Sequence, residues 1–409
     1  MSQTERLRIE RLGHQGDGIA PGPVFVARAL PGEEVEGRRD GDRLLEPKIV
    51  TPSSDRVAAP CPHYRGCGGC GLQHASDDFV AAWKLGVVRQ ALTAQGIEAE
   101  FRDVITSPPM SRRRATVAAR RTKKGAMAGF YGRASGVITE IPNCHLLRPA
   151  LIAGLPVAEE LAKLGGSRKG ALAVTLTETE NGLDVLARGG KALDGRLRMD
   201  LAALAEAHDL ARIAWEDEVI ATRHPPEQVF GPVRVSPPPG AFLQATREGE
   251  AALLAAIEEI TDGAKRIADL FCGSGTFSLP LARRATVHAV EAVPEMLSAL
   301  DRGWRHAQGL RQVTTEARDL FRRPLRPDEL AAHDAIVIDP PRAGAQAQTE
   351  ALAEAQVPVI AAISCNPVTF ARDAKLLTDA GYRLNWVQVV DQFRWSNHVE
   401  LAARFSLSH

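Results

Sequence analysis

The sequence has few aromatic side chains, few cysteines, no net charge and no long apolar run. Only 5% of its 409 residues are aromatic, and 50 Lys+Arg balance 50 Asp+Glu. No stretch reaches the ~18 apolar residues of a membrane-spanning helix, which excludes an integral membrane protein of that kind. The polar start, MSQTERLRIERLGHQGDG, lacks the apolar core of a secretory signal, so we expect a cytoplasmic protein.

Six cysteines in a long chain of this kind are too few for a disulfide framework. We expect them to be metal ligands, a nucleophile or core residues. The 44% hydrophobic content is sufficient to bury real cores, which excludes general disorder. The length suggests two or three domains.

The balanced charge hides an asymmetry along the chain. Residues 1–150 carry 22 basic and 16 acidic side chains, whereas the remainder carries 28 and 34. The segment 102–133 has nine basic residues and one acidic residue, including the run Arg112-Arg113-Arg114. Such a basic segment attracts polyanions, and we interpret it as a contact for the backbone of a nucleic acid.

Turn signals and periodicity divide the chain into three parts. Residues 1–57 contain short strand-like runs typical of a small barrel of the OB type. Residues 58–235 predict an α+β central domain, with an amphipathic helix over 80–95. Residues 236–409 alternate strands and helices, which predicts a doubly wound α/β domain with a parallel sheet.

Four cysteines suggest a metal centre. Cys61, Cys67 and Cys70 are spaced C-x5-C-x2-C around two glycines, and Cys144 follows in IPNCHLL. Four thiolates suit tetrahedral zinc or an iron–sulfur cluster, and the spacing leaves both open. His63 and His74 flank the cysteines and are alternative ligands.

The stretch RIADLFCGSGTFSLPLA predicts a cofactor site. An apolar strand ends at Asp269, and Gly273 and Gly275 allow a ligand to approach the backbone closely. The next strand ends at Glu291, where a carboxylate can bind both hydroxyls of a ribose. The arrangement resembles class I S-adenosylmethionine-dependent methyltransferases, and Cys272 within it reads as a packing residue.

Three motifs at the ends of later strands carry candidate chemistry: Asp339-Pro340-Pro341-Arg342, Ser364-Cys365-Asn366-Pro367 and the segment 393–400. Sheets of this kind place ligands and catalysts at strand carboxyl ends. Cys365 precedes a predicted helix, whose N-terminus is expected to lower the thiol pKa. We therefore interpret Cys365 as a nucleophile.

With these motifs in view, the chain resembles the uracil-C5 RNA methyltransferase family, in its form with an N-terminal TRAM domain and an iron–sulfur cluster. The resemblance runs nearly end to end. It rests on RIERLGHQGDGIA, CPHYRGCGGCGLQH, IPNCHLL, AFLQAT, DLFCGSGTF, AVEAVPEML, IDPPRAGA, ISCNPVTFARDAKLL and HVE.

The resemblance implies a role for individual residues. Cys365 would add to C6 of uridine, and Glu400 would be the base that removes the C5 proton. S-adenosylmethionine would contact Gln244, Phe271, Thr276, Glu291, Asp319 and Asp339. Cys61, Cys67, Cys70 and Cys144 would bind a 4Fe-4S cluster, and residues 1–57 would be the TRAM domain. The implied substrate is RNA, with 23S rRNA favoured and tRNA possible, and we expect a monomer.

Two departures and three alternatives accompany this reading. Arg394-Trp395-Ser396 stands where the family usually has Pro-x-Thr, and Thr276 stands where related enzymes often have Asn. The alternatives are methylation of a base amino group, methylation of cytosine C5, and a binding protein with an inactive transferase domain. Amino-group methyltransferases normally have an aromatic residue after the Asp-Pro-Pro motif, where this chain has Arg342. Cytosine-C5 enzymes usually have a cysteine directly after the first proline of the motif, where this chain has Pro341.

Overall fold

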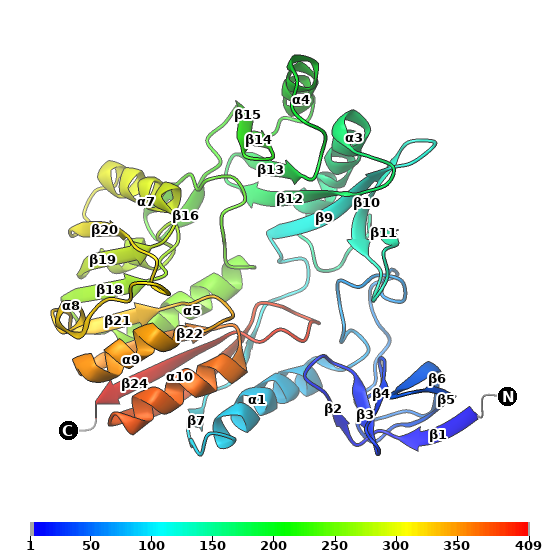
Figure 1. The fold of residues 1–409 in the computed structure, drawn as a ribbon, viewed down its shortest axis with the longest axis horizontal. Helices are drawn as coiled ribbons and strands as arrows, with labels where there is room; N and C mark the ends of the chain where they lie inside the picture. The colour runs from blue at the N-terminus through cyan, green and yellow to red at the C-terminus, as the bar shows by residue number, and fades with distance from the viewer. Residues whose placement is uncertain (1–3, 408–409) are drawn as a thin grey trace.

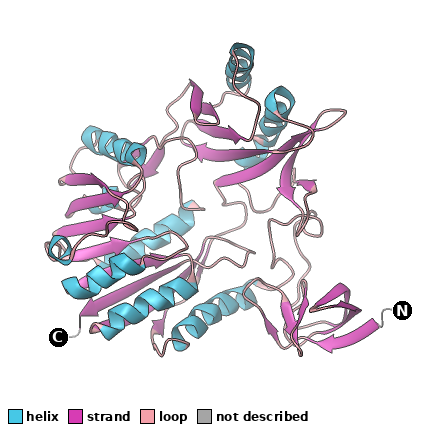
Figure 2. Cartoon of the chain, viewed as in Figure 1, coloured by secondary structure: helices cyan, strands magenta, loops and turns pink. Residues whose placement is uncertain are grey.

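The computed structural model describes residues 4–407, which form three large β-sheets and a short hairpin (Figure 1). Helices lie beside the central and C-terminal sheets, whereas the N-terminal sheet consists of strands and turns (Figure 2). Within residues 4–407 no helix combines the length and the apolar character that crossing a membrane requires.

The N-terminal sheet contains six strands, whereas the sequence indicates four strand-like runs over residues 6–50. Their order is β1-β5-β6-β4-β3-β2, and Val24, Val26, Val35 and Leu44 form its core. The OB-type barrel stays a prediction. The strands are β1 (Thr4–Arg8), β2 (Arg11–Leu12), β3 (Gly18–Ala20), β4 (Val24–Val26), β5 (Glu34–Asp40) and β6 (Arg43–Thr51).

The central sheet has seven strands in the order β11-β10-β9-β12-β13-β14-β15. Helix α3 packs against β9 and β10, which buries its apolar face with Val157 and Leu161. The elements are β9 (Arg114–Arg121), β10 (Ala126–Tyr131), β11 (Ile138–Glu140), α2 (Pro149–Ala153), α3 (Leu155–Gly165), β12 (Leu172–Thr179), β13 (Gly182–Arg188), α4 (Gly195–Ala207), β14 (Arg212–Trp215) and β15 (Glu218–Thr222). The hairpin β16 (Gln228–Phe230) and β17 (Val233–Val235) follows.

The C-terminal sheet confirms the predicted parallel α/β architecture. Strands β20, β19, β18, β21 and β22 are parallel neighbours in that order, and β24 joins β22 antiparallel. The strands are β18 (Arg266–Leu270), β19 (Thr286–Glu291), β20 (Val313–Ala317), β21 (Ala335–Ile338), β22 (Val359–Ser364), β23 (Tyr382–Asp391) and β24 (Leu401–Leu407).

Two apolar cores form on opposite sides of this sheet because successive side chains point to opposite faces. Ile267 packs with α5 and α7, whereas Ala268 packs with α9 and α10. The helices are α5 (Arg247–Ile260), α6 (Ser278–Leu281), α7 (Pro294–His306), α8 (Pro327–Leu330), α9 (Gln346–Ala355) and α10 (Pro367–Asp379).

A segment from the first third of the chain joins the C-terminal sheet. Helix α1 (Asp77–Thr93) confirms the predicted amphipathic helix, and the Ser76 side chain caps it by accepting from Phe79 N–H. It packs against α10, and β7 (Glu100–Phe101) and β8 (Ile105–Thr106) pair with β23. Residues predicted to belong to the central domain therefore pack against the C-terminal sheet.

Candidate active site

The strand ends of the C-terminal sheet bring the predicted site residues together. Asp339 directly follows β21 and Cys365 directly follows β22, while Glu291 ends the parallel strand β19. Because the carboxyl ends of parallel strands meet at one edge of a sheet, these side chains share one edge. Glu400 reaches the same region from the start of the antiparallel strand β24.

Cys365 lies in the short link between β22 and α10 and is half-buried. Helix α10 begins with Pro367, whose fixed φ suits the first helical turn, and the Asn366 side chain accepts from Val368 N–H at 3.1 Å. Cys365 faces a groove formed by all three parts of the chain. Its lining includes His14, Cys70, Arg133, Arg342, Cys365 and His398.

Two glutamines connect the two candidate acid–base carboxylates. The Gln244 amide donates to Asp339 Oδ2 at 3.1 Å, and the Gln392 amide donates to Glu400 Oε2 at 3.1 Å and to Gln244 Oε1 at 2.6 Å. Ala245 N–H donates to Gln392 Oε1 at 2.8 Å, which fixes that side chain. The network connects the half-buried Asp339 to the buried Glu400.

Burial raises the pKa of both carboxyls in this network. Burial contributes most to the raised pKa of Glu400, and the charge of Asp339 adds to it. The pKa of Asp339 rises to about 7, chiefly through burial, with the charge of Asp269 adding to it. Groups with raised pKa values can accept and release protons near neutral pH, as acid–base catalysis requires.

The predicted lowering of the Cys365 pKa is wrong for the protein without ligands. Burial raises the pKa of the thiol to about 11, and the charges of Glu400 and Asp339 raise it further, while Arg342 opposes them. The helix N-terminus is outweighed because the thiol is half-buried beside two carboxylates. The side chain is therefore mainly a thiol at neutral pH.

The turn after β18 has the features of a cofactor site. Ser278 Oγ–H donates to Asp269 Oδ2 at 2.5 Å, whereas the buried atoms Asp269 Oδ1 and Ser274 Oγ have no hydrogen-bond partner among the described residues. Buried polar atoms of this kind normally have a partner, so a polar ligand fits here. Phe271 adopts a left-handed φ of 64°, and Thr276 lies partly exposed in the same turn.

Glu291 is oriented by backbone N–H groups around this turn. Its Oε2 accepts from Gly273 at 3.1 Å, and its Oε1 accepts from Ala292 at 2.8 Å and Val293 at 3.1 Å. The carboxylate is thereby fixed at the end of β19, where the sequence predicts a ribose-binding acid. Cys272 is buried in the neighbouring core, as its packing role requires.

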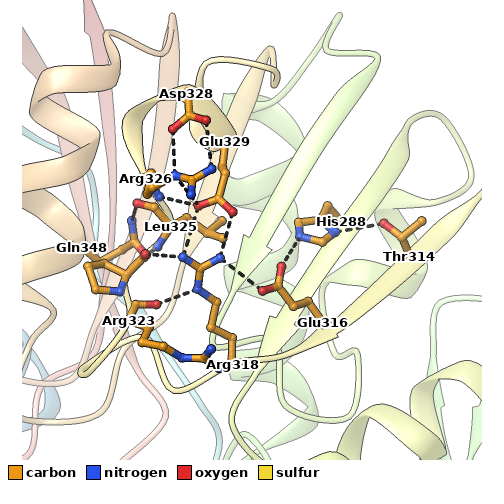
Figure 3. Close-up of polar contacts among 11 residues, drawn as sticks. His288, Thr314, Glu316, Arg318, Arg323, Leu325, Arg326, Asp328, Glu329 and Gln348 are labelled. Atoms are coloured by element: carbon orange, nitrogen blue, oxygen red, sulfur yellow. Dashed lines mark hydrogen bonds and ion pairs between the residues drawn. The ribbon is translucent and has the colours of Figure 1, made fainter.

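Asp319 lies just beyond β20 and caps its own loop by accepting from Phe321 N–H at 3.0 Å. Arg318 anchors this loop: its guanidinium pairs with Glu329 at 3.0 Å and donates to the Pro324 carbonyl at 2.6 Å (Figure 3). The loop presents Phe321, which is 50% exposed and whose ring lies 5.5 Å from that of Phe271.

Sequence reasoning missed Phe321, Gln392 and Ser278 as parts of this region. Gln392 lies eight residues before Glu400 and directly after β23, so its place at a strand end was the available signal. Phe321 lies four residues after β20, in a loop without a recognisable motif. Its proximity to Phe271 is visible only in the fold.

The four motif cysteines line one small buried hollow beneath the central sheet. Gly69 N–H donates to Cys67 Sγ at 3.3 Å, and Leu146 N–H donates to Cys144 Sγ at 3.4 Å. Among residues 4–407, however, no group of three or more His, Cys, Asp or Glu side chains has a geometry that could hold a metal ion. The predicted metal centre is thus not supported by that geometry.

The run Arg112-Arg113-Arg114 does not form the solvent-facing nucleic-acid contact that the sequence suggested. Arg113 is only 2% exposed, donates to the Gln244 carbonyl and pairs with Glu250 on α5. Arg114 donates to the Gly240 carbonyl at 3.0 Å. These side chains connect the central sheet to the C-terminal domain, and the exposed basic residues of the segment include Arg121, Lys123 and Lys124.

The parallel sheet, the glycine turn and the acidic strand ends define the fold class of a methyltransferase. Over 98% of the chain, the fold matches the crystal structure of Pyrococcus abyssi tRNA (uracil-54, C5)-methyltransferase in complex with S-adenosyl-L-homocysteine. The TM-score is 0.76 at 24% sequence identity, and the match covers 99% of that chain. This similarity concerns the fold.

Sequence comparisons place the chain in a family. Residues 305–406 match the tRNA (uracil-5-)-methyltransferase family model. The chain is 44% identical over 405 residues to an uncharacterized RNA methyltransferase of Brucella suis, covering 98% of each. It is 31% identical to the 23S rRNA (uracil(1939)-C(5))-methyltransferase RlmD of Shewanella piezotolerans, covering 100% of this chain and 96% of the relative. The chain belongs to the RNA (uracil-C5)-methyltransferase family and is an enzyme of that class.

Proposed function

We propose that this enzyme methylates C5 of a uridine in 23S rRNA through a covalent bond between Cys365 and C6 of the base. The observation that carries the proposal is the placement of the Cys365 thiol at the wall of the groove, within the electrostatic reach of Asp339 and Glu400. A nucleophile and a base at one site are what this reaction needs.

The reaction needs Cys365 because C5 of uridine is a weak nucleophile. It needs Glu400 because the C5 proton must leave after methylation. The Cys365 thiolate adds to C6, and the electron pair of the C5–C6 bond makes C5 nucleophilic. S-adenosylmethionine, when bound, supplies an electrophilic methyl group. After C5 has taken the methyl group, Glu400 removes the C5 proton, the double bond returns and the C6–S bond breaks.

The cofactor region fits a nucleoside with a charged tail. The unpartnered Asp269 Oδ1 and Ser274 Oγ offer polar contacts, and Glu291 offers a fixed carboxylate for ribose hydroxyls. Phe271 and Phe321 offer an aromatic surface for the nucleobase of the cofactor. We assign Gln244, Thr276, Asp319 and Asp339 to the same site, with Gln244 orienting Asp339.

The groove supports RNA as the substrate, because three parts of the chain line it together. They are the N-terminal part, the cysteine segment (residues 61–70) and the residues that follow β21 and β22. A target base must leave its stack to reach Cys365, which favours loops and single strands. The full-length similarity to an enzyme named for 23S rRNA supports that substrate. The family model and the matching fold carry tRNA names, so tRNA is the alternative.

We further propose that Cys61, Cys67, Cys70 and Cys144 bind a 4Fe-4S cluster. The four cysteines line one hollow, and backbone N–H groups directed at sulfur suit thiolate ligands. The choice of a cluster over zinc rests on the resemblance to the family. A bound cluster would fix the segment 61–70 to Cys144. Iron and sulfide analysis of anaerobically purified protein, with Cys144→Ser as control, tests this assignment.

Two active-site variants test the mechanism. Cys365→Ala should lose methyl transfer by about 10⁴-fold or more, because no other group can activate C5. Glu400→Gln should slow turnover by about 10²–10⁴-fold and accumulate an SDS-resistant protein–RNA adduct, because the bond to C6 forms but is not released. Full activity in Cys365→Ala, or an adduct in that variant, would contradict the covalent mechanism.

A further inference from the structure

The loop between β23 and β24, residues 392–400, holds the longer of the two departures from the family pattern, Arg394-Trp395-Ser396. It begins at Gln392, which binds Glu400, and it ends at Glu400 itself. Any shift of this loop therefore shifts the proposed base. Hydrogen bonds connect this loop to the residues directly after Cys70.

Trp395 is fixed at two points. Its carbonyl accepts from Gly71 N–H at 2.8 Å and from Leu72 N–H at 2.9 Å, directly after Cys70. Its ring is 5% exposed and belongs to the same apolar core as Cys67 and Cys144. Trp395, in the loop that leads to Glu400, is thus embedded in the core of the central domain.

The backbone at Trp395 adopts a left-handed φ of 59°, which is uncommon for a bulky side chain. Such a conformation costs on the order of 1–3 kcal/mol and persists only where the surroundings fix it. The two N–H donors and the core packing supply that constraint. The loop conformation therefore depends on contacts outside the C-terminal domain.

Arg394 and Asn397, on either side of Trp395 in this loop, extend the attachment. Arg394 pairs with Asp77 at the start of α1, donates to the Ser107 carbonyl and lies 4.9 Å from the Trp395 ring. Asn397 donates to the His14 carbonyl at 3.3 Å. Two residues of the departure, Arg394 and Trp395, consequently contact other parts of the chain.

The start of the loop is held separately by a buried ion pair. Lys84 on α1 is fully buried, and its ammonium donates to Asp391 at 2.6 Å and to the Phe393 carbonyl at 3.1 Å. The region around Asp391 is therefore fixed from α1, while Trp395 fixes the middle of the loop. Loss of the Trp395 anchor would free the segment that leads into Glu400.

We propose that Trp395 is a positioning residue for Glu400, through which the cysteine segment sets the geometry of C5-proton removal. The inference rests on the proposed function, in which Glu400 acts after the Cys365 adduct has formed. Trp395 contacts neither carboxylate, so its effect falls on the late step. Cys365 lies in a different segment, the link between β22 and α10, so adduct formation does not require the Trp395 anchor.

The experiment separates the two steps with RNA that contains 5-fluorouridine. The C5 fluorine cannot be removed as a proton, so the covalent adduct accumulates without help from Glu400. Trp395→Gly suits the test because glycine accepts the positive φ and only the ring anchor is lost. Adduct formation on fluorinated RNA and turnover on uridine RNA are measured with the full chain.

We expect Trp395→Gly to form the adduct within about threefold of the native rate and to lose turnover by about 10²-fold, as expected for a misplaced base. Trp395→Phe should restore most of the turnover. Trp215→Phe, in the same core but away from the loop, should leave turnover unchanged at temperatures where the protein is folded.

Unchanged turnover in Trp395→Gly would overturn the inference, and so would equal losses of turnover and adduct, which indicate general damage. Failure of the native chain to form an adduct on fluorinated RNA would instead contradict the proposed function. A thermal melt of each variant identifies one that does not fold, in which case Trp395→Ala takes the place of Trp395→Gly under the same criteria.

Discussion

At the residue scale, Cys365 must act as a thiolate in surroundings that favour the thiol. Burial and two carboxylates raise its pKa to about 11, and only Arg342 opposes them strongly. The end of β22 brings Cys365 to the site, but it does not activate the thiol. Activation must therefore come with the charges of the bound ligands.

The pH dependence of the reaction follows from these shifts. The thiolate form of Cys365 increases about tenfold per pH unit below its pKa of about 11, whereas Glu400 acts only after methyl transfer, so its ionisation does not enter kcat/KM. The value of kcat/KM should therefore rise by about tenfold per unit between about pH 6.5 and 9. A rate that falls over this range would contradict the assignment of Cys365 as the attacking group.

Asp269 gives a stability prediction of definite sign. Burial raises its folded-state pKa to about 7. A carboxyl with a raised folded pKa stabilises the fold at pH values below its unfolded pKa, and this stability is lost as pH rises through the folded pKa. Asp269→Asn should therefore increase the free energy of unfolding at pH 8, by at most about 4 kcal/mol.

Denaturant unfolding of native and Asp269→Asn protein at pH 5 and pH 8 measures this effect. The difference between the two proteins should be larger at pH 8, because asparagine carries no charge to bury. The variant should also bind S-adenosylmethionine more weakly if Asp269 belongs to the cofactor site. Equal stability of the two proteins at pH 8 would show that Asp269 is not destabilising.

At the element scale, the strand ends were predictable and the long-range attachments were not. The motif around Cys365 carries its own helix start in Pro367 and Asn366, so local sequence was sufficient there. The run Arg112–Arg114 looked like a polyanion contact because its buried partner, Glu250, is 137 residues away. An even longer separation along the sequence hides the pairing of β7 and β8 with β23.

The basic segment 102–133 has two expected roles. Arg113 stabilises the fold, and the exposed residues of the β9–β10 hairpin contact RNA. Arg113→Ala leaves Glu250 buried without its partner and should lower the free energy of unfolding by about 3–5 kcal/mol. Neutralising Arg121, Lys123 and Lys124 should leave stability unchanged. It should weaken RNA binding and reduce its salt dependence, by a slope of about 2–3.

Denaturant unfolding and RNA titrations at several salt concentrations measure both effects. The hairpin variant serves as the matched control for Arg113→Ala, because both remove basic side chains from one segment. A stable Arg113→Ala protein with weakened RNA binding would return that residue to the RNA contact. Unchanged salt dependence in the hairpin variant would exclude the hairpin from the RNA surface.

At the scale of the whole molecule, three sheets contribute to one groove. The sequence predicts the parallel sheet through its strand–helix alternation and the cysteine site through its spacing. It does not predict that His14, Cys70 and Cys365 share one lining, because that depends on how the sheets pack. The relation between the cysteine segment and the loop before Glu400 likewise belongs to the assembled fold.

Nucleoside mass spectrometry tests the central claim most directly. Anaerobically purified enzyme is incubated with labelled S-adenosylmethionine and with separate 23S rRNA and tRNA fractions from cells that lack uracil-C5 methyltransferases. We predict labelled 5-methyluridine in 23S rRNA and none with Cys365→Ala. Label confined to tRNA would contradict the proposed substrate, and label in another nucleoside, or in none, would contradict the proposed chemistry.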